Sequence, residues 1–276
     1  MDKLSVIVTA RNAEKTIRVT LKSLMSSIRK HDEILILLDA CTDTTGDIAA
    51  SVCDSRIKIF EHKSGLGRSR GRNFLIDKSD STFLAICDAD DLSLPWRFNL
   101  ARQLLVDYDA VFGTAIVFGK TLRPLPVIPQ IPRKITSEQM PLELLGRNPL
   151  VHSTATFKRS VFEEVGLYRD SEAEEYDLWL RMVNANKFLY RSAMPVALYR
   201  FHPSQASKSP GFVQRGLECR YVIAEQKKLA ERLGLVSASI EGIRELSRER
   251  VKKTGFRTKL EVQGLPSFMT RNTTRK

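Results

Sequence analysis

The chain has 276 residues, and its 44 Lys and Arg against 32 Asp and Glu give a formal net charge of +12. A hydrophobic content of 42% excludes a disordered composition and is enough for a sizeable core. The positive charge favours an anionic partner such as nucleic acid, anionic lipid, a nucleotide or a sugar phosphate.

The four cysteines form no Cys-x-x-Cys pair and no Cys/His zinc pattern, so neither a disulfide framework nor structural zinc is expected. Residues 1–5 lead directly into a strand pattern without the layout of a signal peptide. No apolar run approaches the roughly 20 residues that span a bilayer. These features predict a cytoplasmic protein.

The first half of the chain alternates strands with helices. Apolar, β-branched runs predict strands over Leu4–Ala10, Glu33–Leu38, Arg56–Phe60, Phe83–Cys87 and Ala110–Phe118. Helices are predicted over Ile17–Ile28, within the turn-rich region Ala40–Asp47, and from Leu92–Trp96 onwards. A Gly/Arg-rich loop is predicted over Lys63–Asn73, followed by a short helix. This alternation predicts a parallel sheet with right-handed crossovers.

The second half is more mixed. The proline-rich segment Arg123–Arg133 predicts a loop or an edge segment, because proline excludes a regular helix. The remaining predictions are strands over His152–Phe157 and Ala197–Phe201 and helices over Leu142–Leu145, Val161–Gly166, Glu174–Val183, Arg220–Leu233 and Ile240–Lys253. The character of the chain changes at Phe212, where the pattern becomes helical and basic.

Three carboxylates, Asp88, Asp90 and Asp91, follow the buried strand at 83–87. Open α/β sheets bind ligands at the carboxyl ends of their strands, and clustered acids raise one another's pKa unless a cation offsets the repulsion. Mg²⁺ or Mn²⁺ takes one or two carboxylates together with waters and substrate phosphates. The stretch therefore predicts a divalent-metal site for a phosphorylated ligand, with an acidic turn before the next helix as the alternative.

Other polar residues fall at the same edge of the predicted sheet. Thr9 and Asp39 stand where the first two strands end, and Arg68, Arg70 and Arg72 lie in the Gly-rich loop. Taken singly, Asp39 is explained as a helix cap and the arginines as a solvated surface. Taken together, an acid for a base or ribose, arginines for phosphates and acids for a metal describe a nucleoside diphosphate site.

These segments, in this order, closely resemble family 2 glycosyltransferases, which are inverting enzymes with the GT-A fold. The resemblance covers roughly residues 4–209. The matching segments are Ser5–Asn12, Asp39–Asp43, Gly71–Asn73, the Asp88-Ala89-Asp90-Asp91 (DxD) motif, Asn148–Thr154, Glu174–Arg181 and Tyr199–His202.

The resemblance implies a Rossmann-like, mostly parallel α/β sheet flanked by helices. It implies a catalytic domain over residues 1–211, followed by a basic helical extension over 212–276. The implied reaction moves a sugar, with inversion, from a nucleotide-diphosphate sugar, expected to be UDP-linked, to a hydroxyl of a glycan or lipid-linked acceptor in cell-surface polysaccharide or glycoconjugate synthesis. Mn²⁺ or Mg²⁺ is the implied cofactor, and no specific nucleic acid is expected as a partner.

The resemblance also implies roles for single residues. The nucleotide-sugar-binding set is Thr9, Ala10, Arg11, Asn12, Asp39, Arg72, Asp88, Ala89 and Asp90. The implied metal ligands are Asp90 and Asp88, with His202 expected either to hold the diphosphate or metal or to pin a loop to the sheet. The acceptor side comprises Asp91, His152 and Trp179, although Asp91 could instead cap the next helix and Trp179 could pack beneath the base.

The catalytic base implied by the resemblance is Glu175, with Asp177 and Glu174 in reserve. The family usually has an aspartate at the position of Glu175. The longer arm of glutamate shifts the carboxylate by about 1 Å, a misplacement that can cost on the order of 10²-fold in rate. Two smaller departures are Leu38, where the family often has a further acid, and Gly71, where it usually has alanine. The alternative explanation of these acids is that they cap a helix or pair with Arg181.

Four other functions compete with this hypothesis. A nucleotidyltransferase would need a Gly-rich phosphate loop after the first strand, and Thr9–Ala13 lacks glycine. A nucleic-acid-binding protein fits the charge but not the lack of basic and aromatic interleaving in the core. A phosphatase would place its Asp-x-Asp motif early in the chain. A non-catalytic glycan-binding relative stays open.

The C-terminal region 212–276 carries fifteen Lys and Arg, seven Glu and no Asp. Its basic helices could lie against anionic lipid at the inner face of the membrane and bring the enzyme to its acceptor. The alternative is a solvated helical cap that covers the domain or forms a homodimer.

Overall fold

The computed structural model describes residues 2–119, 133–202, 205 and 209–258, with side chains described as far as 253. Of the predicted proline-rich segment 123–133, only Arg133 lies among the described residues. Of the predicted basic extension 212–276, residues 259–276 also lie outside them.

The described strands form one eight-stranded sheet in the order β3-β2-β1-β4-β7-β6-β8-β5. Their bounds are β1 Leu4–Ala10, β2 Glu33–Asp39, β3 Ile57–His62, β4 Phe83–Ile86, β5 Leu92–Ser93, β6 Ala110–Phe118, β7 Thr156–Lys158 and β8 Leu189–Arg200. The first four strands in this order are mutually parallel. In the other half β7 is antiparallel to both β4 and β6, β8 is parallel to β6, and β5 is antiparallel to β8. The predicted mostly parallel α/β sheet is confirmed.

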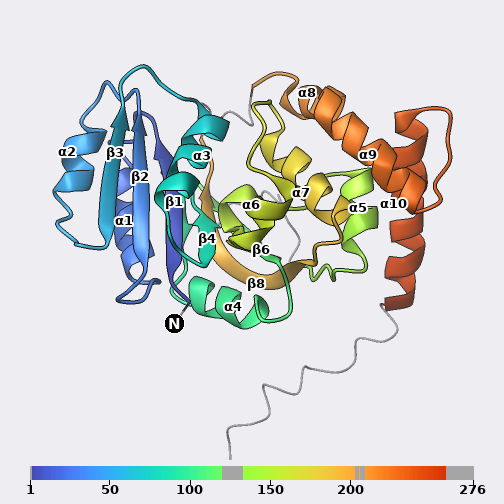
Figure 1. Ribbon diagram of the computed structural model, residues 1–276, viewed down its shortest axis with the longest axis horizontal. Helices are drawn as coiled ribbons and strands as arrows, with labels where there is room; N and C mark the ends of the chain where they lie inside the picture. Colours follow the sequence, from blue (N-terminus) through green and yellow to red (C-terminus); the bar gives the residue numbers. More distant parts are fainter. Residues whose placement is uncertain (1, 120–132, 203–204, 206–208, 259–276) are drawn as a thin grey trace, which may run out of the picture.

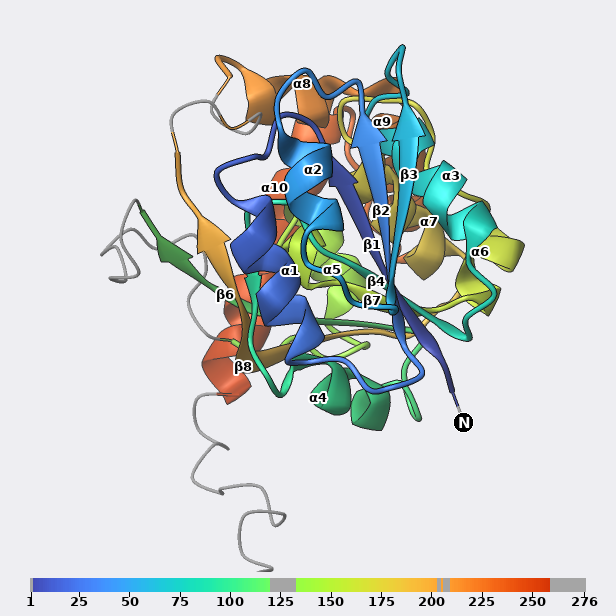
Figure 2. The same ribbon diagram turned by 90° about the vertical axis from the view of Figure 1, so that its left-hand side faces the viewer.

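Helices cover both faces of this sheet. Their bounds are α1 Ile17–Met25, α2 Thr45–Ala50, α3 Arg68–Lys78, α4 Arg97–Leu104, α5 Met140–Gly146, α6 Ser160–Val165, α7 Glu174–Asn184, α8 Phe212–Glu218, α9 Arg220–Arg232 and α10 Ile240–Thr258, with a 3₁₀ turn, η1, at His152–Thr154. Figure 2 shows α1 and α2 on one side of β1–β3, and α3, α6 and α7 on the other.

The side chains of the central strands alternate between two cores. In β1, Ile7 packs with the core beneath α3 and α7, whereas Val6 and Val8 pack with the core beneath α1 and α4. Because both faces are buried, the strands are apolar at nearly every position. This is why the uninterrupted apolar runs of the sequence predict these strands correctly.

Several predicted elements are wrong at their ends. Leu92–Ser93 is not the start of a helix but a short strand that pairs with Ala197 and Leu198, and α4 begins only at Arg97. Residues 152–154 form a 3₁₀ turn instead of a strand. The predicted loop 63–73 contains the first half of α3. In each case pairing or packing with distant residues decides the local conformation.

The C-terminal helices share the core of the sheet-containing part. Figure 1 shows α8, α9 and α10 together at one end of the molecule, far from β3. Helix α9 packs on α7 and α10 packs on α5, and buried apolar residues of α9 and α10, including Val222, Leu229 and Ile243, join the core that contains Trp179. The division into two domains at residue 212 stays a prediction.

Candidate active site

A cleft of about 1370 Å³ opens at the carboxyl ends of β1, β2 and β4. Its walls come from the β1–α1 loop, α3, the acidic loop after β4, η1, α7 and the chain after β8, and the predicted residues that line it are Thr9, Ala10, Arg11, Asn12, Asp39, Arg72, Asp88, Ala89, Asp90, His152, Glu175 and His202. The volume exceeds the roughly 300–1,000 Å³ of a typical ligand pocket. It has room for a nucleotide sugar together with part of an acceptor.

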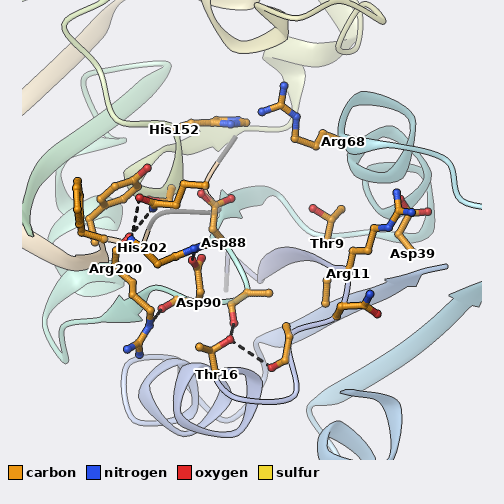
Figure 3. Close-up of a pocket in the computed structure, with 18 of the residues that line it drawn as sticks. Thr9, Arg11, Thr16, Asp39, Arg68, Asp88, Asp90, His152, Arg200 and His202 are labelled. Carbon is orange, nitrogen blue, oxygen red and sulfur yellow. Dashed lines mark hydrogen bonds and ion pairs between the residues drawn. The ribbon is translucent and has the colours of Figure 1, made fainter. Parts of the chain in front are cut away.

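Three members of the predicted nucleotide-sugar-binding set lie at one end of this cleft. Figure 3 shows Thr9, Arg11 and Asp39 at one end of the view and Asp90 and His202 at the other. The carboxylate of Asp39 accepts hydrogen bonds from the backbone N–H groups of Leu66 (2.5 Å) and Gly67 (3.0 Å). A side chain held in this way presents its remaining lone pairs in a fixed direction.

Two glycines allow α3 to lie close to the ends of β1 and β2, where Thr9 and Asp39 stand. Gly67 has a φ of +79°, in the left-handed region that favours glycine, and this turns its N–H toward Asp39 just before the helix begins. At Gly71 an added Cβ would lie 2.9 Å from Leu37 and 3.3 Å from Thr9. The absence of a side chain at Gly71 lets α3 approach the strand ends closely.

The acidic loop is fixed from both sides. The carbonyl oxygen of Ala89 accepts hydrogen bonds from the hydroxyls of Thr16, the N-cap residue of α1, and Thr20 on α1, both at 3.0 Å. On the other side, the backbone N–H of Arg200 donates to Asp91 at 2.9 Å, and the Arg200 guanidinium donates to the carbonyl of Asp90 at 2.8 Å. The loop is therefore rigidly placed before any ligand binds.

Asp90 and His202 form a pair at the end of the cleft opposite Asp39. The Nε2 atom of His202 lies 2.9 Å from Oδ2 of Asp90, and both side chains remain partly exposed to the cleft. No group of three or more metal-ligating side chains occurs within the described residues. One carboxylate and one imidazole, with Asp88 nearby, fit a hard divalent cation that takes its other ligands from a diphosphate and water. The imidazole makes Mn²⁺ a better fit than Mg²⁺, which prefers oxygen ligands.

Arg72 connects the acidic loop to α7. Its side chain is 6% exposed, and its guanidinium lies 2.9 Å from Glu174 and 3.7 Å from Asp88. Burial raises the pKa of Asp88, and the neighbouring Asp90 raises it further while Arg72 lowers it. The positive charge of Arg72 therefore partly offsets the negative charge of the acidic loop.

Glu175 is the carboxylate of α7 that faces the cleft. Its Oε2 atom lies 3.5 Å from Nδ1 of His152, and its side chain is 26% exposed. Burial raises its pKa to about 7, and the negative charge of Glu174 adds to this, against the opposing effect of Arg72. A carboxylate with a pKa near the working pH is suited to act as a general base.

Four predicted site residues do not line the cleft. Asp177 is fully buried and pairs with Arg181 (2.9 Å) and Arg169 (3.0 Å), so its carboxylate does not reach the cleft. Glu174 is likewise buried, against Arg72. Of these pairings, only the one with Arg181 was an open alternative, and Asp177 adopts it; Glu174 pairs with Arg72 instead.

The other two were expected on the acceptor side. Asp91 is 1% exposed, and one of its carboxylate oxygens accepts the Arg200 N–H behind the cleft. Burial, followed by the charges of Asp88 and Asp90, raises the pKa of Asp91 well above its usual range. Trp179 has no exposed surface and stacks on Phe157 at 5.5 Å. It packs beneath the site, as its alternative explanation held.

Sequence reasoning missed several residues that hold the site. Thr16, at the N-cap of α1, and Thr20 are four residues apart, a spacing that puts both hydroxyls on the same side of the helix. Tyr168, whose hydroxyl lies 2.8 Å from Nε2 of His152, and Arg97, whose guanidinium donates to the carbonyl of Ile86 at 2.6 Å, carry no sequence signal. Their partners are distant in the chain or are backbone groups.

The chain is similar in sequence to known proteins. Residues 5–166 match the model of the family described as "Glycosyl transferase family 2". The chain is 34% identical over 208 residues to the UDP-Glc:alpha-D-GlcNAc-diphosphoundecaprenol beta-1,3-glucosyltransferase WfaP of Escherichia coli, covering 75% of this chain and 80% of that protein. It is 24% identical over 221 residues to the O-antigen biosynthesis glycosyltransferase WbnJ of Escherichia coli, covering 76% and 84%.

The fold also matches a solved structure. The crystal structure of S. aureus TarS 1-349 in complex with UDP-GlcNAc superposes with a TM-score of 0.66 at 19% identity, covering 84% of this chain and 71% of that one. This similarity shows the fold, and the family model, which spans more than half of the chain, shows the family. The chain belongs to glycosyl transferase family 2 and is a glycosyltransferase of the GT-A fold.

Proposed function

We propose that the chain transfers a sugar from a UDP-sugar to a hydroxyl of a lipid-linked glycan, with inversion, in the synthesis of a cell-surface polysaccharide. The name of WfaP states a UDP-glucose donor, a diphosphoundecaprenol-linked acceptor and a beta linkage, and the TarS crystals contain UDP-GlcNAc. These are the properties of relatives, and they make the corresponding donor and acceptor the first to test here.

One observation carries this proposal. Asp88 and Asp90 after β4 line the same cleft as Glu175, whose pKa is raised to about 7. The two aspartates are suited to hold a cation at the leaving diphosphate. Glu175 is suited to take the proton of the incoming hydroxyl. A binding protein without catalysis would have no need of a carboxylate tuned in this way.

The nucleotide would lie across the ends of β1 and β2. Asp39, held by two backbone N–H groups, would accept a hydrogen bond from the base, and Thr9 and Arg11 would border it. Arg68 also lines the cleft and could face the diphosphate as a charge-assisted donor. Asp90 and His202, with Asp88, would hold the divalent cation. When bound, that cation stabilises the negative charge of the departing diphosphate.

Glu175 would take the proton of the acceptor hydroxyl as the oxygen attacks the anomeric carbon. In a single displacement the nucleophile approaches opposite the leaving group, which inverts the anomeric configuration. Glu174 and Asp177 cannot share this task, since both carboxylates are buried and held by arginines. The mechanism therefore uses one general base.

The test is a transfer assay with a panel of nucleotide sugars, a GlcNAc-diphospholipid acceptor and Mn²⁺ or a chelator. We expect UDP-sugar turnover, loss of activity on chelation, and a product of inverted anomeric configuration by NMR. Glu175→Gln should lower kcat by about 10²–10⁴-fold, and Asp90→Ala should weaken the response to Mn²⁺. The exposed Glu163→Gln on α6 is the matched control. Full activity of Glu175→Gln would exclude this base, and undiminished Mn²⁺ dependence of Asp90→Ala would exclude this metal ligand.

A further inference from the structure

His152 lies between Glu175 and a buried tyrosine. Its Nε2 atom is 2.8 Å from the hydroxyl of Tyr168, and its Nδ1 atom is 3.5 Å from Oε2 of Glu175. The second separation is long for a hydrogen bond, but catalytic hydrogen bonds often shorten only when the substrate is bound. Figure 3 shows the ring of His152 across the cleft from Thr16.

The imidazole of His152 is neutral. Its side chain is 7% exposed, and burial, together with the positive charges of Arg72 and Arg68, lowers its pKa well below the usual value. A neutral imidazole has one N–H donor and one acceptor nitrogen. Its two neighbours therefore decide which nitrogen carries the proton.

The neighbours favour a proton on Nδ1. The carboxylate of Glu175 can only accept a hydrogen bond, whereas the hydroxyl of Tyr168 can also donate one. Burial raises the pKa of Tyr168, so this phenol stays protonated and can donate a hydrogen bond to Nε2 of His152. The tautomer that satisfies both neighbours has Nδ1–H directed at Glu175.

Tyr168 and the His152 ring are both held in place. Asn73 on α3 donates to the carbonyl of Tyr168 at 2.8 Å and accepts its backbone N–H at 3.0 Å. Trp179, on the buried side of α7, packs edge-on against the imidazole with a centroid distance of 5.6 Å. A ring held at its far nitrogen and packed against Trp179 has little freedom to turn away from Glu175.

The other charged groups that act on Glu175 come from three elements. They are Glu174 on α7, Arg72 and Arg68 on α3, and Asp88 after β4. The two arginines pair with Glu174, at 2.9 Å and 3.4 Å. Both guanidinium groups are thus engaged by Glu174. The group that lies beside Oε2 of Glu175 is the imidazole of His152.

We propose that His152 is a positioning residue whose Nδ1–H holds one carboxylate oxygen of Glu175, with the hydroxyl of Tyr168 selecting the required tautomer. The other oxygen of Glu175 then stays directed at the acceptor hydroxyl. This inference rests on the proposed role of Glu175 as the general base. It replaces the expected acceptor-binding role of His152 with one exerted through the base.

The experiment compares two substitutions at His152. In His152→Asn the amide nitrogen can donate from nearly the position of Nδ1, whereas His152→Phe fills the space without a donor. We expect His152→Phe to lower kcat about 10- to 100-fold, since a misplaced base loses up to about 10² in rate, with little change in the KM for the donor sugar. The acidic limb of its kcat/KM profile should move to higher pH, because the ionised carboxylate loses a hydrogen bond. His152→Asn should recover most of the rate and the wild-type limb.

Tyr168→Phe keeps the packing and removes only the hydroxyl, so it guards against a His152 variant that fails to fold. It should show the same two changes to a smaller extent, with a Tm near that of the wild type. Tyr190→Phe, a tyrosine of β8 that stacks on Tyr108, is the matched control and should change neither. Equal defects in His152→Asn and His152→Phe, or an unmoved limb in His152→Phe, would overturn the inference. If Glu175→Gln abolishes transfer and His152→Phe transfers at the wild-type rate, this inference alone fails; if Glu175→Gln is fully active, the proposed base fails first.

Discussion

Glu174 and Glu175 are neighbours in the chain, yet their carboxylates have different surroundings. Consecutive side chains of a helix point about 100° apart, so one of the pair enters the core and the other reaches the cleft. Glu174 is 1% exposed between Arg72 and Arg68, and Glu175 borders the cleft beside His152. The sequence predicts three candidate bases in one segment, Glu174, Glu175 and Asp177. Of these three, the orientation of α7 brings Glu175 alone to the cleft.

The first prediction at this scale concerns pH. Because the pKa of Glu175 is raised to about 7, the ionised form that acts as a base is the minor species below that pH. We expect kcat/KM to rise about tenfold per pH unit below about 7 and to level off above it. A profile measured with saturating Mn²⁺ and acceptor would show this. A limb near 4.5, the ordinary range of glutamate, would contradict the assignment.

The second prediction concerns Arg72. Arg72→Met removes the buried one of the two cations that pair with Glu174 and leaves only the partly exposed Arg68 beside that charge. Removing the partner of a buried charge costs up to about 3–5 kcal/mol. Urea unfolding should show this loss, and the double variant Arg72→Met with Glu174→Gln should recover part of it. Arg70→Met is the control, because the Arg70–Asp170 pair is exposed on both sides and should contribute less than about 1 kcal/mol. Equal losses for both arginines would refute the argument.

At the scale of elements, α7 connects the cleft, the sheet and the C-terminal helices. Its first turn carries Glu175, its Trp179 stacks on Phe157 of β7, and the helix also packs against α9. A buried network joins α7 to the C-terminal helices. The amide of Gln226 donates to the hydroxyl of Tyr176 at 2.9 Å and to the carbonyl of Leu145 at 3.0 Å, and it accepts from Arg244 at 2.8 Å.

This network gives the third prediction. Gln226→Leu would leave the Arg244 guanidinium without its side-chain acceptor and two oxygens without their donor, all in a buried region. We expect the free energy of unfolding to fall by about 1–3 kcal/mol or more. Gln214→Leu, on the exposed helix α8, should change it little. If the two variants melt at the same temperature, the C-terminal helices do not stabilise α7 through this network.

Elements also show where prediction from sequence fails. The helix α3 was expected to begin after residue 73, because its Arg- and Gly-rich first turns resemble a solvated loop. Its start is instead determined by Asp39, whose carboxylate binds the two N–H groups before the helix. The conformation of Leu92–Ser93 is set by pairing with β8, about a hundred residues later in the chain. Contacts of this kind leave no local signal.

At the scale of the whole molecule, charge and shape suggest how an enzyme with a lipid-linked acceptor would work. The net charge is +12, and no helix in the described ranges is both long and apolar enough to cross a membrane. We propose that the basic C-terminal helices meet the anionic surface of the membrane, where each Lys or Arg close to the surface contributes about 1 kcal/mol. The opposite proposal, a solvated cap or dimer surface, predicts no such binding.

Vesicle flotation distinguishes these two proposals. The chain should float with vesicles rich in phosphatidylglycerol at about 0.1 M salt and be released at about 1 M, where the Debye length falls to about 3 Å. Neutralising the exposed Lys227, Lys252 and Lys253 to Gln should weaken binding. The matched control neutralises the exposed Lys22, Lys30 and Lys63 in the sheet-containing part. Equal weakening by both sets would place the binding in the total charge instead of the C-terminal helices.

The sequence by itself determined the α/β class, the central strands and the acids that follow β4. Apolar runs report burial on both faces, and a ligand site at the strand ends follows from parallel topology alone. Only the tertiary structure decided which acids reach the cleft. Asp177 and Asp91 are buried, whereas the pKa of Glu175 is raised to about 7. His152 lies beside Glu175, and its other ring nitrogen contacts the hydroxyl of Tyr168, sixteen residues later in the chain. The physical reason is that pKa and orientation depend on burial and on partners from other elements, and neither is encoded in the local pattern of residues.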